Sequence, residues 1–266
     1  MTNGTIARDR WDRPLIVPPE GGTPVGYTRV TTFAGSIEDQ SGLTKWKQRT
    51  TAIGLADRPD LMLAVNASRD DKRELGKLVD QAMEAGGAST SSNKGTAVHL
   101  LSEKLDRGET LPPGLPDDIL RDLELYRAAT HGMNIVEIEE FLVCDELQAA
   151  GTTDRIWEFG GNRYIGDLKT GQQIDLGILK IAIQLAIYSR SVAYDEDTGA
   201  RSPINVSQDW GIVAHLPVEK GEINLYWIDL NLGWRGALLA QQVREIRKIK
   251  MKDAVSLISS SQEAAA

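Results

Sequence analysis

The chain of 266 residues has a formal net charge of −8 and 41% hydrophobic residues, which is typical of a globular protein with one large domain or one domain and an extra lobe. This acidic balance excludes a protein that coats nucleic acid nonspecifically, although it is compatible with an enzyme that has a local basic groove. The single cysteine, Cys144, excludes an internal disulfide and an iron–sulfur cluster held by cysteines.

The first part of the chain predicts an irregular arm followed by helices. Residues 1–26 are rich in proline and glycine and lack the apolar core of a signal peptide. Residues 27–33 are strand-like, whereas residues 36–57 and 68–85 have a helical pattern. The stretch 86–95, GGASTSSNKG, predicts a flexible joint. No apolar run is long enough to cross a membrane, so we expect a cytoplasmic protein without a membrane partner.

The spacing of apolar residues changes from a helical period to alternation near residue 134, and alternation is typical of strands. The expected elements after the joint are helices at 96–106 and 117–130, strands at 134–144, 150–159 and 162–169, a long helix at 176–194, an exposed loop at 195–203, strands at 208–217 and 222–230, and a last helix at 232–252. This order predicts an α/β fold with a mixed central sheet flanked by helices.

Two acids and a lysine interrupt the apolar strands of this predicted sheet. Asp154 lies in the second strand, and Asp167 and Lys169 lie at the end of the third. Carboxylates from neighbouring strands are ligands that Mg²⁺ prefers, and the carbonyl of Leu168 can point at the same ion. Lys169 projects to the same side of the strand as Asp167, where it can orient or deprotonate water or neutralise a phosphate. The pattern predicts a divalent-metal site that hydrolyses a phosphodiester.

Polar residues on two helices are candidates for the same site. Lys180, Gln184 and Tyr188 form a stripe on a helix that is otherwise almost all Ile, Leu and Ala. Such a stripe needs polar partners, either in a metal and phosphate cleft or by local bonding at the helix surface. His99 and Glu103 lie four residues apart on an earlier helix and therefore share one face. A lone histidine is more often structural than catalytic, so His99 is a candidate for the site only because of the residues around it.

The ordered set of motifs resembles the PD-(D/E)XK nuclease superfamily, and within it the RecB-like exonuclease branch that includes phage and CRISPR-associated exonucleases. The motifs that carry the resemblance are Gly95-Thr-Ala-Val-His99-x3-Glu103, Gly151-Thr-Thr-Asp154-Arg155, Gly166-Asp167-Leu-Lys169-Thr170-Gly171 and Gln184-x3-Tyr188. Several relatives hold an iron–sulfur cluster with four cysteines, and the single cysteine here departs from that pattern.

The resemblance implies a fold and a site. It implies a restriction-endonuclease-like core at 91–255, an arm and helical lobe at 1–90 and a disordered tail at 256–266. Glu140 is a weaker candidate than the other site residues, because Glu137 and Glu139 on its strand are expected to be solvated. The resemblance implies that the metal ligands are His99, Asp154, Asp167 and the carbonyl oxygen of Leu168. It implies that Lys169 is the catalytic lysine and that Gln184 and Tyr188 position the substrate. The residues expected beside the ligands or the phosphate are Glu103, Arg155, Thr170, Glu140 and Lys180.

The expected activity is exonucleolytic hydrolysis of linear single- or double-stranded DNA with Mg²⁺ or Mn²⁺, in recombination, repair or replication. A recombinase, an annealing protein or a helicase would be the partner, and a phage-encoded protein would work in the host cytoplasm. The chain has no P-loop pattern, so we expect no nucleotide cofactor, and any unwinding would come from the partner. Two alternatives stay open: a non-catalytic nuclease-fold module that binds DNA ends or a recombination partner, and a metal-dependent endonuclease.

Two basic stretches could bind the DNA backbone. Trp46 is surrounded by Lys45, Lys47 and Arg49, so it could stack on a base, although a buried tryptophan on a solvated helix is the more common arrangement. The predicted helix at 232–252 carries six basic residues and one acid between Trp234 and Lys252, which is compatible either with a DNA-binding face or with an ordinary solvated helix.

Overall fold

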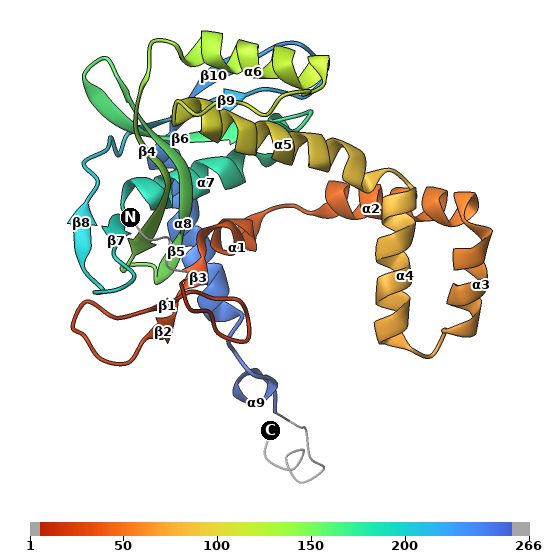
Figure 1. The fold of residues 1–266 in the computed structure, drawn as a ribbon. Helices are drawn as coiled ribbons and strands as arrows, with labels where there is room; N and C mark the ends of the chain where they lie inside the picture. Colours follow the sequence, from red (N-terminus) through yellow and green to blue (C-terminus); the bar gives the residue numbers. More distant parts are fainter. Residues whose placement is uncertain (1–5, 257–266) are drawn as a thin grey trace, which may run out of the picture.

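A computed structural model describes residues 6–256, and in it the chain forms an α/β fold with a mixed central sheet, as predicted (Figure 1). The strands are β1 (Leu15–Ile16), β2 (Val25–Gly26), β3 (Thr28–Arg29), β4 (Asn134–Cys144), β5 (Ala149–Phe159), β6 (Asn162–Lys169), β7 (Val192–Tyr194), β8 (Arg201–Pro203), β9 (Trp210–His215) and β10 (Asn224–Asp229). The main sheet has the order β10-β9-β6-β5-β4-β7-β8, with β3 added beside β5.

The helices form two layers on this sheet and a separate lobe (Figure 1). The α-helices are α1 (Val30–Ala34), α2 (Ser41–Asp57), α3 (Pro59–Ala67), α4 (Lys72–Ala85), α5 (Ala88–Asp106), α6 (Asp117–Thr130), α7 (Ile178–Ser189), α8 (Leu230–Ile246) and α9 (Met251–Ala254), and the 3₁₀ helices are η1 (Gly35–Ile37) and η2 (Asp175–Gly177). None of the helices within residues 6–256 is long and apolar enough to cross a lipid bilayer.

Alternating side chains of the strands bury two separate cores. On one face, Trp157 packs with Leu123 and Tyr126 beneath α5 and α6. On the other face, Ile156 packs with Ile183 and its neighbours beneath α1, α7 and α8. A fully buried side chain of this size stabilises the fold by roughly 1.5–3 kcal/mol. The two layers hold the sheet rigidly, so side chains at the strand ends keep fixed positions.

Strands β5 and β6 separate partway along their length. They form an antiparallel pair from the hairpin turn up to Arg155 and Gly166. Beyond that pair β5 stays bonded to β4, whereas β6 becomes bonded to β9, which runs parallel to it. Asp154 and Asp167 are the next residues on the two strands, so both carboxylates lie at the point where the strands part.

The helical lobe has three helices rather than the two that were predicted. Helix α3 was not predicted, and together with α2 and α4 it buries a small core that includes Leu61, Leu78 and Ala82. The flexible joint predicted at 86–95 is wrong, because α5 begins at Ala88 and continues through the stretch. In Figure 1 the lobe extends to one side of the sheet. The glycine- and serine-rich composition predicted a flexible joint, but these residues are tolerated in a helix whose later turns pack against the rest of the protein.

Several element ends also differ from the prediction. The predicted helix at 176–194 ends at Ser189, and the chain then forms β7. The predicted loop at 195–203 contains strand β8, where Arg201 is held by Asp145 at 2.7 Å, a partner far away in the sequence. The last predicted helix is two helices, α8 and α9. Most of the predicted tail, 257–266, lies outside the described residues.

Candidate metal centre

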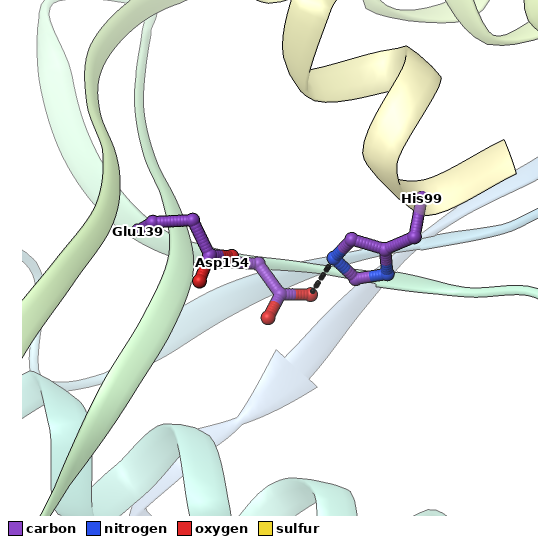
Figure 2. Close-up of side chains that lie close together, drawn as sticks. All are labelled: His99, Glu139 and Asp154. Carbon is purple, nitrogen blue, oxygen red and sulfur yellow. Dashed lines mark ion pairs between the residues drawn. The ribbon is translucent and has the colours of Figure 1, made fainter. Parts of the chain in front are cut away.

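The site assembles around Asp154, between α5 on one side and α7 on the other. His99 projects from α5 toward the carboxylate, and its Nε2 atom lies 3.2 Å from Oδ2 of Asp154 (Figure 2). The hydrogen bond to Asp154 raises the pKa of His99 despite partial burial. Burial alone would raise the pKa of Asp154, but His99, Lys169 and the backbone N–H of Leu168 outweigh it and lower that pKa. Asp154 is therefore ionised and ready to bind a cation.

Arg155 holds helix α5 in the position that this contact requires. The Nε atom of Arg155 donates to Asp106 at 2.6 Å, and its Nη2 atom donates to Ser102 at 2.7 Å. The hydroxyl of Ser102 in turn donates to the carbonyl oxygen of His99. Arg155 is fully buried among these groups and Tyr126. Arg155 was predicted beside the metal ligands or beside the phosphate, and the enclosure of its guanidinium under α5 and α6 favours the first of these positions.

Glu139 belongs to the site, although it was predicted to be solvated. On β4, Glu139 lies between Ile138, which pairs with Arg155, and Glu140, which pairs with Thr153, so Glu139 is opposite Asp154. The ligand atoms of His99, Glu139 and Asp154 all lie within 4.8 Å of one another (Figure 2). The weaker candidate Glu140 is not part of this group. The prediction chose the wrong glutamate of the strand.

The backbone at Glu139 is strained in a way that suggests a role. Its φ of 56° lies in the left-handed region, which costs a non-glycine residue about 1–2 kcal/mol. Desolvation and the nearby Asp154 and Glu103 raise the pKa of Glu139 to about 7. A strained acid held beside other acids is typical of a functional position. The structure supplies the register that the sequence did not, since Cys144 pairs with Ala149 across the turn and counting back from that pair reaches Glu139 opposite Asp154.

Asp167 and Lys169 form the second half of the site, at the end of β6. Asp167 is only 2% exposed, and Nζ of Lys169 lies 2.8 Å from each of its carboxylate oxygens. Burial, followed by repulsion from Asp154, raises the pKa of Asp167 to about 6. Within the described part of the chain, Oδ2 of Asp167 accepts no hydrogen bond. Its contact with Lys169 is an ion pair at 2.8 Å without a hydrogen bond, so a lone pair of this oxygen is left for a cation.

The backbone of Leu168 points into the same space. Its N–H donates to Oδ2 of Asp154 at 3.2 Å, whereas the carbonyl of Lys169 faces the other way and accepts from Leu216. The N–H and C=O of one residue in a strand point to the same side, so the carbonyl of Leu168 is directed toward β5. This agrees with the prediction that the carbonyl assists the metal ligands.

Helix α7 contributes the predicted pair Gln184 and Tyr188, both of which are buried. The hydroxyl of Tyr188 is hydrogen-bonded with Gln184, and burial together with Asp154 and Asp167 raises its pKa. The ring also lies against Gly151, where an added Cβ would meet the hydroxyl at 2.8 Å. Glycine at this position therefore leaves room for the tyrosine.

Lys180 does not join this stripe. Its Nζ atom is 3.0 Å from Glu38, so it ties α7 to the segment before α2. The prediction that Lys180 faces the cleft with Gln184 and Tyr188 is wrong. The reason is a partner on a distant segment, which the spacing along the helix cannot reveal.

An open cleft of about 540 Å³ leads to His99 and Glu139. It includes Glu103 and Thr170, as expected for residues near the ligands, and Gly95 allows α5 to approach Thr170 closely. The remaining two histidines are outside the cleft lining, and His215 contacts the carbonyl of Gly171 at 2.8 Å. The residues that line the cleft are Gly95, Thr96, His99, Leu100, Glu103, Glu139, Thr170, Gly171 and Gln172.

These groups fit a divalent cation. Carboxylate oxygens, a carbonyl oxygen and one imidazole are suitable ligands for Mn²⁺, and the oxygens also suit Mg²⁺. Three carboxylates close together repel one another, as the raised pKa values of Glu139 and Asp167 indicate. A cation would remove that repulsion and provide a partner for the free oxygen of Asp167.

Metal affinity is expected to fall in acid. The pKa values of Asp167 and Glu139 are raised to about 6 and about 7, so both carboxyls are ionised above pH 7 and protonated well below pH 6. A cation must displace these protons, so the affinity should fall roughly tenfold per pH unit for each proton displaced. Titration calorimetry with Mn²⁺ at pH 5, 6, 7 and 8 measures this. An affinity that is the same at pH 5 and pH 8 would contradict the assignment.

Replacing Glu139 with glycine should separate strain from metal binding. Glycine adopts a φ of 56° without penalty, so the metal-free variant should be as stable as the wild type or more stable by roughly 1 kcal/mol. The same variant lacks one ligand, so Mn²⁺ should raise its melting temperature less than that of the wild type. Glu140→Gly, on the next residue of β4, is the control and should keep the full Mn²⁺ effect.

Comparisons with known proteins add no relative to this picture. No protein-family model matches the chain, and no curated protein matches it significantly. The resemblance to the PD-(D/E)XK superfamily therefore stays a prediction that depends on the residues brought together here.

Proposed function

We propose that this protein is a metal-dependent deoxyribonuclease that hydrolyses phosphodiester bonds, acting as an exonuclease on linear DNA. The observation that carries the proposal is the convergence of Asp154, Asp167 and Lys169 where β5 and β6 part, with His99 and Glu139 completing a ligand set beside an open cleft. Polar groups this costly to bury are kept together when they share a chemical task.

The residues divide into metal ligands and groups that face the substrate. His99, Glu139 and Asp154 would hold the metal, with Asp167 and the carbonyl of Leu168 beside them. A bound divalent ion supplies polarisation of the phosphoryl oxygen and lowers the pKa of the attacking water. The ligand set alone would bind a metal without cutting DNA, so catalysis also needs a positive charge near the phosphate.

Lys169 supplies that charge. Burial opposes its ionisation, but Asp167 and Asp154 outweigh this effect and raise its pKa, so Lys169 is an ammonium ion at neutral pH. An ammonium ion cannot accept a proton from water. Lys169 therefore orients the attacking water or neutralises charge that develops on the phosphate, rather than acting as the general base. Tyr188, whose hydroxyl stays protonated, can donate a hydrogen bond to the substrate beside Gln184.

The proposed setting is DNA recombination, repair or replication in the cytoplasm. A recombinase, an annealing protein or a helicase would deliver or consume the DNA ends. We prefer an exonuclease because the motif set is most similar to that of RecB-like exonucleases.

The decisive test is a cleavage assay on end-labelled DNA. Purified protein is incubated with linear single-stranded, linear double-stranded and closed circular DNA, with Mn²⁺, Mg²⁺ or EDTA. We expect mononucleotides or short products from linear DNA with metal, and no products in EDTA. Cleavage of closed circles would favour an endonuclease, and the absence of cleavage with every metal would overturn the proposal.

A non-catalytic DNA-end-binding module is the second candidate. It is supported by the burial of Asp167, which is only 2% exposed. The complete set of two aspartates and a lysine counts against it, because a binding module has no need to keep them. Tight DNA binding without cleavage, unaffected by Mn²⁺, would favour this candidate.

A further inference from the structure

The first half of helix α2 is exposed on all sides. Every residue from Ser41 to Arg49 is exposed, whereas the second half of the helix packs on α4 through Thr50 and Gly54. Trp46, which was expected to be buried, is 42% exposed. A solvated helical stretch that contains an exposed tryptophan suggests that something binds there, because this stretch gains no stability from a core.

The charge of this stretch is opposite to that of the protein as a whole. The chain carries a net charge of −8, yet no acidic residue lies between Gln40 and Ala56. Lys45, Lys47 and Arg49 form no ion pair with any residue in 6–256, whereas Arg58 in the same lobe is paired with Asp60. The cations of the stretch are therefore available to an external anion.

Cations and the aromatic ring lie close together on the helix surface. Lys45 and Arg49 are four residues apart and share one face, and Trp46 borders that face. A row of cations beside an aromatic ring is the arrangement with which proteins bind single-stranded nucleic acid, because the cations contact phosphates and the ring stacks on a base.

The position of the stretch is fixed relative to the cleft at both ends. Just before it, Glu38 forms an ion pair with Lys180, which lies one turn of α7 before Gln184. Just after it, Thr50 lies against Gly86, at the junction of α4 and α5. Helix α5 then continues to His99, which lines the cleft. The basic stretch of α2 therefore begins near the start of α7, which carries Gln184, and ends near the start of α5, which carries His99.

We propose that residues 41–49 of α2 bind the single-stranded end of DNA that enters the metal centre, with Lys45 and Arg49 on phosphates and Trp46 on a base. This inference depends on the proposed nuclease function for its substrate. It assigns the helical lobe a role in holding DNA rather than in chemistry. The other candidate, the basic end of α8, is partly used within the fold, since Arg244 donates to Thr28 and Lys248 pairs with Glu245.

The test compares two charge-matched triple variants. One replaces Lys45, Lys47 and Arg49 with glutamine, and the control replaces three exposed cations of α4 in the same way, which are Lys72, Arg73 and Lys77. Binding of a fluorescein-labelled single-stranded oligonucleotide is measured in EDTA, which prevents cleavage, between 50 and 300 mM salt. Circular dichroism confirms that the lobe remains helical in both variants.

The slope of log K against log salt is negative, and we expect it to become less steep by about 1.4 in the α2 variant, because the two phosphate contacts of Lys45 and Arg49 contribute about 0.7 each on single strands. At 0.1 M salt this corresponds to an affinity loss of roughly 25-fold, and Trp46→Ala should lose roughly tenfold with an unchanged slope. The α4 variant should keep the wild-type slope. Equal slopes for the α2 variant and the wild type would overturn the inference.

Failure of this inference can be distinguished from failure of the nuclease proposal. Thymidine 5′-p-nitrophenyl phosphate has a single nucleotide and no further strand to contact α2, so the α2 variant should hydrolyse it at the wild-type rate with Mn²⁺. A wild-type protein that cleaves DNA and an α2 variant that binds normally would refute the role of α2 alone. A wild-type protein that cleaves neither substrate would refute the nuclease proposal.

Discussion

Asp167→Asn is expected to abolish DNA hydrolysis, lowering kcat on the order of 10³-fold, while the protein stays folded. The amide keeps the volume of the buried side chain and can still accept a hydrogen bond from Lys169, but it removes the negative charge that a cation needs. Folding should not suffer, because the raised pKa shows that burial disfavours the ionised carboxylate relative to water, and the neutral amide avoids that cost. Single-turnover cleavage of labelled DNA with Mn²⁺ measures the loss.

A second substitution separates metal binding from catalysis. Lys169→Met should lose activity to a similar extent, since the charge near the phosphate is gone, yet it should still bind Mn²⁺ because lysine is not a ligand. Asp167→Asn should weaken Mn²⁺ binding as well as activity. The control is Lys180→Met, whose side chain is engaged with Glu38 away from the ligands and should keep kcat within about threefold of the wild type. Full activity in Asp167→Asn would refute the site.

Arg155→Met is expected to destabilise the protein by about 3–5 kcal/mol, which is the usual cost of removing one partner of a buried ion pair. Asp106 would be left with only the hydroxyl of Tyr126 as a partner, and Ser102 would lose the donor that fixes its hydroxyl. The melting temperature should fall by roughly 10 °C, as measured by circular dichroism. The contact between His99 and Asp154 should also loosen, because both Ser102 and Asp106 lie on α5.

The control for Arg155 is Arg163→Met, since Arg163 is a half-exposed arginine on β6 at 3.9 Å from Glu158. An exposed pair of this kind stabilises a protein by less than about 1 kcal/mol. A double variant, Arg155→Met with Asp106→Leu, should recover part of the loss because no unpaired charge stays buried. If Arg155→Met kept its melting temperature but lost DNA affinity, Arg155 would contact the phosphate, which is one of the two positions predicted for it from the sequence.

The sequence by itself determined the α/β class, the three antiparallel strands and the residues that meet at the site. The alternation of apolar side chains over residues 134–169 can be satisfied only by strands with buried faces, so β4, β5 and β6 follow from local pattern. Asp154, Asp167 and Lys169 could be identified because charged groups in such strands are costly unless they work together. Gln184 and Tyr188 could be identified as a polar stripe on an otherwise apolar helix, whereas His99 became a candidate through the resemblance of the ordered motifs.

Tertiary structure alone decided the partners of the remaining polar residues. Glu139 rather than Glu140 joins His99 and Asp154, because cross-strand register determines which side chains meet. Lys180 and Arg155 were expected beside the ligands or the phosphate, but each is engaged by an acid on another segment, Glu38 and Asp106. A lysine or arginine pairs with the acid that is nearest to it in space. The order of residues along one helix or strand does not reveal that distance.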